Sequence, residues 1–394
     1  MSSSRADFLV IERLATILLL NHPIHVVLGR GYFSQSGDDG IIDVVKRLDA
    51  IGCNHSKDIS LSKLTDSSAL IQEVSDIVCK FGLLLASRNV RAVILCGDRW
   101  ELLGYGNAAF LCRVPIFHIS GGEVTEGAID DSIRHVVTKL ASLHFVSNYE
   151  FARNVSLMGE EDWRISVVGE VGLDELENHK FSSKFELSQK HSINLYDKLL
   201  LMTMHPSTND PRAGYEKQII SVLKALEVFK DFTVIITAPG RDEGADLFIK
   251  YIKQFIINNT NCKYIPHLGD QDYINFINIS SAVVGNSSSG LWLVPSLKTG
   301  SVNIGSRQAG RVSGGSVFHS SYDPNEIMEK INLAINVKGM KITNPYDPHE
   351  DSSSALRIAY AIDQAWHHEK FLTAKKFINN CDVSQQSSLL KGFT

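Results

Sequence analysis

The residues best suited to chemistry are carboxylates that directly follow short, apolar, β-branched runs. Asp98 stands in Gly97-Asp98-Arg99, after the run AVILC at 92–96. Four more acids fall within nine residues after the run IFHIS at 116–120: Glu123, Glu126, Asp130 and Asp131. Crowded carboxylates acquire different pKa values, so that one can donate a proton while another accepts one. The pattern therefore predicts general acid–base chemistry.

Helix capping is the alternative explanation for these acids. Aspartate is favoured at the N-cap and in the first turn of a helix, which would explain Asp98 and either Asp130 or Asp131. Capping does not explain Glu123, which follows the pair Gly121-Gly122. Paired glycines let the backbone approach a ligand closely. We therefore favour a functional role for this segment.

A second group of residues is suited to binding an anion. The loop Gly285-Asn286-Ser287-Ser288-Ser289-Gly290 follows the run AVVG and precedes an apolar helical stretch. Small residues leave backbone N–H groups free to hold a phosphate, and the hydroxyls add donors. The loop lacks the lysine of a P-loop, so we do not expect an ATPase. A simple cap and loop remains the alternative.

Basic side chains near strand ends could complete a phosphate site. His205 follows the run 198–204, and Arg307 and Arg311 lie among glycines after 301–304. A histidine or arginine there could donate to a phosphate, although a lone histidine is more often structural and a solvated basic loop is equally plausible. The further basic candidates for substrate or nucleotide binding are Arg99 and His118, whereas the pattern alone makes no case for Arg5.

The elements that must position these residues follow a βαβ rhythm. Strands are predicted at 24–28, 92–96, 116–120, 143–147 and 165–168 and, after a break, at 198–204, 233–238, 263–266, 282–285 and 301–304. Helices are predicted at 72–87, 131–142, 214–230, 244–258 and 270–280. Such alternation predicts parallel sheets, whose ligands bind beyond the carboxyl ends of the strands.

We therefore predict an α/β fold of two Rossmann-like domains facing a central cleft. The first domain covers 1–172 and carries the carboxylates. The second covers 190–350 and binds the anion, because the polar run after Gly172 interrupts the pattern. The final helical segment, 354–378, is expected to pack back on the first domain.

Composition limits the kinds of partner. The 394 residues carry a net charge of -5, which does not favour nucleic acid or an anionic membrane as partner. The six cysteines form no CxxC pair, and no signal peptide or membrane-spanning run is evident. A cytoplasmic location is the expectation.

Together these segments resemble the UDP-N-acetylglucosamine 2-epimerase family. The resemblance runs from Ser4-Arg5-Ala6-Asp7 to about Arg311 and is densest at 97–147, and the stretch 121–135 looks like the hydrolysing branch. It implies a GT-B-like fold, a homodimer or tetramer, and no cofactor or metal. The implied catalytic carboxylates are Asp98, Glu123 and Asp131 or Asp130, and the implied diphosphate-side residues are Arg5, His205, Ser288 and Ser289.

The implied reaction releases a free 2-epimerised sugar and a nucleoside diphosphate. UDP-N-acetylglucosamine is the leading substrate. A UDP-2,4-diacetamido-2,4,6-trideoxy-glucose, a GDP-linked sugar, a glycosyltransferase and an inactive sugar-nucleotide-binding protein are the alternatives. Three departures from the family pattern stand out: only Met1–Ser4 precede Arg5, where relatives have an apolar strand; Ser120 replaces a usual His or Glu; and Leu293 replaces an acid suited to ribose hydroxyls.

Overall fold

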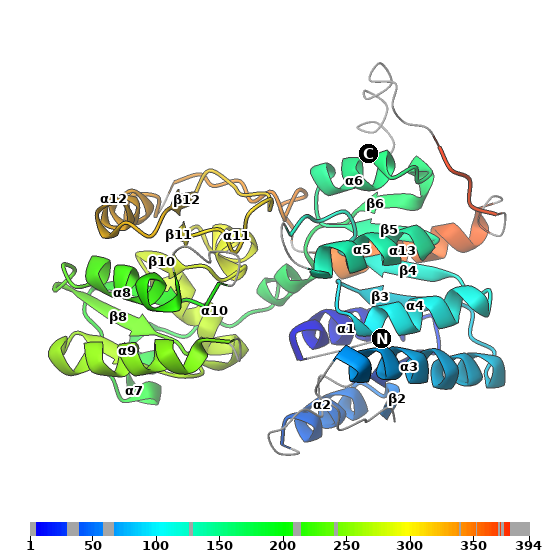
Figure 1. Ribbon diagram of the computed structural model, residues 1–394, viewed down its shortest axis with the longest axis horizontal. Coiled ribbons are helices and arrows are strands. Elements are labelled where there is room, and N and C mark those ends of the chain that lie inside the picture. Colours follow the sequence, from blue (N-terminus) through cyan, green and yellow to red (C-terminus); the bar gives the residue numbers. More distant parts are fainter. Residues whose placement is uncertain are drawn as a thin grey trace. The chain divides into compact units, whose positions relative to one another are not determined.

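The chain forms two compact units in a computed structural model (Figure 1). Unit 1 is Met1–Asp174 with Asp351–Thr394, and unit 2 is Glu175–Glu350. The structure describes residues 5–29, 39–57, 67–125, 129–207, 214–239, 243–338, 340–351, 353–368, 371 and 374–378. No helix within these residues is both long and apolar enough to cross a membrane.

Unit 1 alternates parallel strands with helices. Its strands are β1 (His25–Leu28), β2 (Asn54–Lys57), β3 (Val93–Cys96), β4 (Ile116–Ile119), β5 (Leu143–Val146) and β6 (Ile165–Val167). Its helices are α1 (Arg5–Leu18), α2 (Asp39–Ala50), α3 (Ser67–Ser87), α4 (Glu101–Leu111), α5 (Ile129–Leu140), α6 (Tyr149–Leu157) and α13 (Ser354–His367). In the described residues β1 pairs with β2, and β3-β4-β5-β6 form a separate four-stranded sheet.

Helices cover both faces of β3 and β4, which explains why these strands are largely apolar. One core joins α1 and α13 to Phe117 and Ile119 of β4. The other joins α3, α4 and α5 to Val93 and Leu95 of β3. Successive side chains on a strand point to opposite faces, so β1, β3 and β4 each contribute to both cores.

Unit 2 is a doubly wound sheet. Its strands are β7 (Lys198–Thr203), β8 (Phe232–Ile236), β9 (Cys262–Tyr264), β10 (Ala282–Gly285), β11 (Gly300–Ile304) and β12 (Val317–Ser320), in the order β12-β11-β10-β7-β8-β9. Its helices are α7 (Lys184–His191), α8 (Gly214–Leu226), α9 (Ala245–Asn258), α10 (Gly269–Ile279), α11 (Ser289–Trp292) and α12 (Pro324–Ile335). The strand order reverses between β7 and β10, where ligands of such sheets bind.

All ten predicted strands and all five predicted helices are present, with ends that differ by a few residues. The α/β fold class and the two Rossmann-like units are confirmed. The sequence analysis missed β2 and β12, because the polar string Asn54-His55-Ser56-Lys57 and the run Val317–Ser320 lack a clear strand pattern. It also named no helix at the positions of α1, α2, α4, α6, α7 and α12.

Two segments differ from the expected domain limits. Unit 2 begins before residue 190 and includes α7, because Lys190 and His191 contact the buried Asp272 of α10. Helix α13 packs in unit 1 but ends at His367 instead of continuing to 378. Beyond it, tertiary contacts replace helical ones: the amide of Ile378 donates to the carbonyl of Gly159.

A buried ion cluster holds this C-terminal segment. The carboxylate of Glu160 is fully buried and contacts Lys139 at 2.5 Å, Lys375 at 2.8 Å and His144 at 3.1 Å. Burial by itself raises the pKa of Glu160, but hydrogen bonds from His144, Lys139 and Lys375 outweigh it and lower the pKa to about 2. The cluster therefore stabilises the fold while Glu160 is ionised.

We expect Glu160→Gln to lower the free energy of unfolding by about 2–4 kcal/mol at pH 7, because it leaves the cations without their counter-charge. A depressed carboxyl pKa contributes stability that is present above the unfolded pKa and lost as the pH falls towards the folded one. The difference between wild type and variant should therefore shrink below about pH 4.5. Urea unfolding followed by tryptophan fluorescence measures it.

The control is Asp231→Asn, which removes the exposed Asp231–Lys198 pair, with 66% and 58% of the side chains exposed. Exposed pairs contribute about 0–1 kcal/mol, so this variant should stay close to wild type. Equal losses in both variants, or a Glu160→Gln difference that does not change with pH, would contradict the role of the cluster.

Candidate functional site

The loops after β3 and β4 adopt left-handed backbone conformations at three positions. Gly97 has φ +81°, Ser120 +64° and Gly122 +76°. A Cβ on Gly122 would lie 2.4 Å from the carbonyl oxygen of Phe151, so only glycine fits there. A positive φ is unfavourable for serine, and such strain is typical of functional sites. These turns place the residues that follow the strands at one edge of the sheet.

Arg134 of α5 joins the two loops. Its side chain is 2% exposed, and its guanidinium contacts the carboxylate of Asp98 after β3 and lies 3.6 Å from that of Asp131. The same group donates to the carbonyl of Glu123 at 2.9 Å and to the hydroxyl of Thr125 at 3.2 Å. One buried cation thus brings together two of the predicted carboxylates and the backbone between them.

The remaining acids lie around the same cation. Asp131 accepts from the amide of Thr125 at 2.6 Å and lies 3.4 Å from Nε2 of His135. Burial, followed by the negative charge of Asp98, raises the pKa of Asp130. Glu123 is 6% exposed. The cluster thus contains carboxylates in unlike environments, which separate acid and base roles require.

The side chains of His118 and Arg99 both contact other groups of the protein. His118 is fully buried, its Nε2 lies 2.9 Å from the carbonyl of Gly97, and its Nδ1 lies 3.1 Å from the hydroxyl of Thr138. Burial lowers the pKa of His118 to about 3, so the ring is neutral at pH 7. That His118 binds substrate stays a prediction; in this structure the ring contacts the protein through both nitrogens, and its contact with Gly97 supports the Asp98 loop. Arg99 contacts the buried Glu101 at 2.9 Å.

In unit 2 the predicted anion loop lies at the point where the strand order reverses. Gly285 ends β10 with φ +143°, and a Cβ there would lie 1.9 Å from the carbonyl oxygen of Thr203 in β7. Asn286 is 1% exposed. Its amide group accepts from the amide of His205 at 2.7 Å and donates to the carbonyl of His205 at 2.8 Å. Asn286 therefore joins the two loops, and its predicted contact with the ligand stays a prediction.

The serines continue this network. The hydroxyl of Ser289 lies 2.9 Å from that of Ser287 and 2.8 Å from that of Tyr273. Arg307 and Gln308 donate to the carbonyl of Asn286 at 3.1 and 3.0 Å. Ser288 precedes α11, and the carbonyl of Gly290 accepts from Ser301. Hydroxyls, a histidine and an arginine are thus collected around one loop.

Three residues named in the sequence analysis are either buried in the core or lie outside the described residues. Arg5 is the first residue of α1, and its side chain lies outside the described residues. Leu293 is 5% exposed and belongs to the core, so it presents no group to a ribose. Residues 126–128, including Glu126, also lie outside the description.

The sequence analysis missed Arg134 and Tyr273 as site residues. Arg134 stands three residues after Asp131, and this spacing places both on one helix face. An arginine between the apolar Ile133 and Val137 of a helix was the available signal. Tyr273 had no signal, because only the fold brings α10 to the serine loop.

Comparison with known proteins agrees with this architecture. The profile of a family described as UDP-N-acetylglucosamine 2-epimerase matches residues 35–363. The chain is 30% identical over 363 residues to "Polysialic acid biosynthesis protein P7" of Escherichia coli, covering 91% of this chain and 92% of that protein. It is 34% identical over 241 residues to "GDP/UDP-N,N'-diacetylbacillosamine 2-epimerase (hydrolyzing)" of Campylobacter jejuni, covering 61% and 62%.

A solved structure shares the fold. The UDP-N-acetylglucosamine 2-epimerase of Neisseria meningitidis, crystallised with UDP-N-acetylglucosamine, superposes with a TM-score of 0.76 at 17% identity, covering 92% of this chain and 98% of that one. The fold class is therefore GT-B-like. By its profile match and its full-length relative, the chain belongs to the UDP-N-acetylglucosamine 2-epimerase family.

Proposed function

We propose that this protein is a hydrolysing 2-epimerase that converts a UDP-linked N-acetyl sugar, first of all UDP-N-acetylglucosamine, into the free 2-epimer and UDP. The observation that carries the proposal is the gathering of Asp98, Asp130 and Asp131 about Arg134 at the ends of β3 and β4. The relatives from Campylobacter jejuni and Legionella pneumophila, both named as hydrolysing, support it.

In the first proposed step a carboxylate removes the proton from C2. The C–H electron pair forms the C1–C2 double bond, and the C1–O bond breaks on the opposite face, so that UDP leaves with that electron pair. The products are a glycal and UDP. A carboxylate suits this role because it accepts a proton when held near the reacting carbon.

In the second step a carboxylic acid returns a proton to C2 from the opposite face, and water adds its oxygen to C1 while its released proton passes to the carboxylate left behind. The base of the first step gives the proton that it took from C2 to solvent. The sum is one water consumed, with inversion at C2. Removal and return on opposite faces require at least two acids. Asp130, whose pKa is raised, suits the donor, because it holds a proton to a higher pH than an ordinary aspartate.

In this proposal the loops of unit 2 bind the diphosphate as it leaves. The hydroxyls of Ser287 and Ser289, His205 and Arg307 provide donors for the phosphate oxygens. Donors aimed at developing negative charge stabilise a leaving group. The free N-acetylmannosamine-type product suits the synthesis of nonulosonic acids for a surface polysaccharide, in line with the name of the Escherichia coli relative.

The second candidate is the same reaction on a nucleotide-linked diacetamido-trideoxy sugar. The names of the Campylobacter and Legionella relatives favour it. Both candidates use one chemistry and differ only in the groups at C4 and C6 of the sugar. A panel of UDP- and GDP-linked sugars, scored for release of diphosphate, distinguishes them.

Incubation with UDP-N-acetylglucosamine in heavy water should give UDP and free N-acetylmannosamine with one deuterium at C2, because the returned proton comes from solvent. Nuclear magnetic resonance of the sugar and chromatography of the nucleotide measure both products. Deuterium at C2 without release of UDP would indicate a non-hydrolysing epimerase. Release of UDP without deuterium would indicate a glycosyltransferase or a simple hydrolase.

Asp98→Asn and Asp131→Asn should each lower kcat by about 10²–10⁴-fold, the usual contribution of a positioned acid or base. Circular dichroism should show that both variants fold. The matched control is Glu150→Gln, an exposed acid in the first turn of α6, which should retain wild-type kcat. A kcat of Asp98→Asn or Asp131→Asn within about threefold of wild type would remove that residue from the mechanism.

Ser289→Ala should raise the Kd for UDP about tenfold, because a hydrogen bond to a charged group contributes about 1.5–3 kcal/mol. Isothermal titration calorimetry measures the Kd. Ser182→Ala serves as control, since Ser182 accepts a hydrogen bond from Asn275 and belongs to no phosphate loop. Unchanged UDP binding by Ser289→Ala would place the diphosphate elsewhere.

A further inference from the structure

The polypeptide beyond α13 returns to the carboxyl-terminal end of helix α5. The ammonium group of Lys375 donates to the carbonyl of Lys139 at 2.6 Å and to the carbonyl of Ala141 at 2.9 Å. Lys139 lies in the last turn of α5, and Ala141 follows the final residue of this helix. The last carbonyls of a helix have no partner within the helix, and a cation there also interacts favourably with the helix dipole. Lys375 therefore caps α5 from a distant part of the chain.

Residues 374–378, which we call the C-terminal clamp, lie against the turn that follows α6. The amide of Ile378 donates to the carbonyl of Gly159 at 3.0 Å. Gly159 has φ +87°, and a Cβ there would lie 2.3 Å from the ring of Phe377. Glycine at this position thus leaves room for the ring. The backbone contact and the ring together fix the register of the clamp.

The buried charge of Glu160 ties the clamp to α5. Its carboxylate contacts Lys375 of the clamp at 2.8 Å and Lys139 of α5 at 2.5 Å. Lys139 also donates to the carbonyl of Met158 at 3.0 Å. Glu160 is fully buried, whereas 24% of the Lys375 side chain is exposed. Removal of Lys375 therefore takes away one of the counter-charges of Glu160 and uncaps α5 at the same time.

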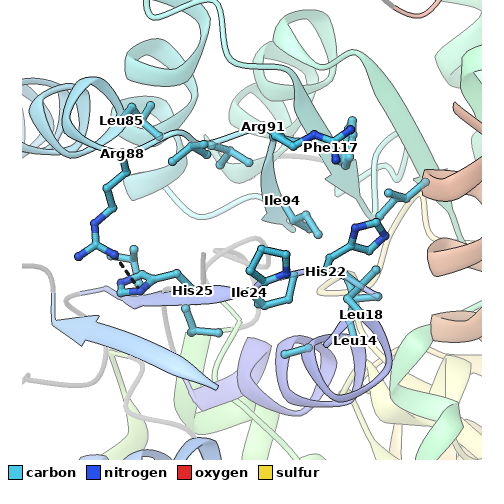
Figure 2. A pocket seen from close by; sticks show the side chains of 18 of the residues that line it. Leu14, Leu18, His22, Ile24, His25, Leu85, Arg88, Arg91, Ile94 and Phe117 are labelled. Atoms are coloured by element: carbon cyan, nitrogen blue, oxygen red, sulfur yellow. Dashed lines mark hydrogen bonds between the residues drawn. The ribbon is translucent and has the colours of Figure 1, made fainter. Parts of the chain in front are cut away.

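Aromatic packing anchors the chain between α13 and the clamp. Phe371 is 5% exposed, and its ring centroid lies 6.0 Å from that of Phe117 in β4 and 4.8 Å from that of Trp366 in α13. Phe117 and Trp366 also line a cavity of about 370 Å³ between β1 and β3 (Figure 2). The cavity leaves part of both rings without neighbours, so Phe371 supplies packing that the cavity does not. The approach to the clamp is thus held on β4, the strand that leads into the acid loop.

Helix α5 connects the clamp to the acid cluster. Asp131 and Arg134 lie near its start, and Lys139 lies in its last turn. An α-helix rises about 1.5 Å per residue, so Asp131 and Lys139 are about 12 Å apart along its axis. A shift of α5 along this axis would move Asp131 and Arg134 together relative to Asp98, which belongs to the loop after β3. A misplacement of about 1 Å can lower a rate about 10²-fold.

We propose that the C-terminal clamp positions α5 for catalysis and that Lys375 is its main positioning residue. By holding the last carbonyls of α5, the clamp keeps Asp131 and Arg134 in register with Asp98. The inference rests on the proposed 2-epimerase reaction, because it concerns the spacing of the carboxylates that carry that reaction. It goes beyond stability, since the clamp determines the rate of the folded enzyme.

The test measures three quantities in the full chain: kcat with UDP-N-acetylglucosamine, the Kd for UDP, and amide hydrogen exchange in α5. Lys375→Met should lower kcat at least about tenfold at a temperature at which circular dichroism shows a folded protein. It should speed exchange of the α5 amides at least about tenfold, because the helix loses its cap. The Kd for UDP should not change, since the loops of unit 2 are assigned that contact.

Lys376→Met is the matched control. The side chain of Lys376 is exposed, and the clamp uses only its amide, which donates to the carboxylate of Glu161 at 3.3 Å. The variant keeps this amide, so all three quantities should stay at their wild-type values.

Phe377→Ala releases the clamp without removing a charge. The ring is 74% exposed, so the variant should fold. It should speed exchange in α5 and lower kcat at least about threefold, and it decides the question if Lys375→Met does not fold.

The proposal is overturned if α5 exchange or kcat stays at the wild-type value in the folded clamp variants, or if Lys376→Met has the same effect as Lys375→Met. A wild type that releases no UDP contradicts the proposed reaction. A wild type that reacts, together with a folded Lys375→Met variant of equal kcat, contradicts the clamp alone.

Discussion

The buried guanidinium of Arg134 is the interaction on which the carboxylate cluster depends. An arginine that is 2% exposed is tolerated only where its charge and donors are matched. Its partners are Asp98 after β3, Asp131 at the start of α5 and the carbonyl of Glu123 between them. The positive charge of Arg134 therefore pairs with both acids and holds both loops. The positions of the two loops are coupled through this one side chain.

Around this cation the protein uses polar groups of two kinds. His118 and Thr138 are buried beneath the loops and fix the backbone at Gly97, while Asp98 and Asp131 keep about a quarter of their side-chain surface exposed. Unit 2 repeats this division: Asn286 is buried and joins two loops, and hydroxyls surround it. In both units a buried, hydrogen-bonded residue joins the loops that carry the candidate site groups.

The two units share an arrangement of parallel strands and polar loops. Both place their polar loops at the carboxyl ends of parallel strands, and in unit 2 these loops lie where the strand order reverses. Unit 2 has a full doubly wound sheet, whereas the described strands of unit 1 form two sheets with a cavity between them.

The sequence by itself determined ten of the strands, about half of the helices and the loops that carry the acids and serines, because apolar periodicity and glycine placement are local signals. Tertiary structure decided the rest. Only the fold shows that Arg134 unites Asp98 with Asp131, that His118 and Asn286 point inward, and that the chain leaves the helix after His367 to reach Glu160. These outcomes depend on burial and on partners up to 236 residues away in the chain, as in the Lys375–Lys139 contact. No local pattern encodes such partners, because the cost of burying a polar group is set by what the fold brings beside it.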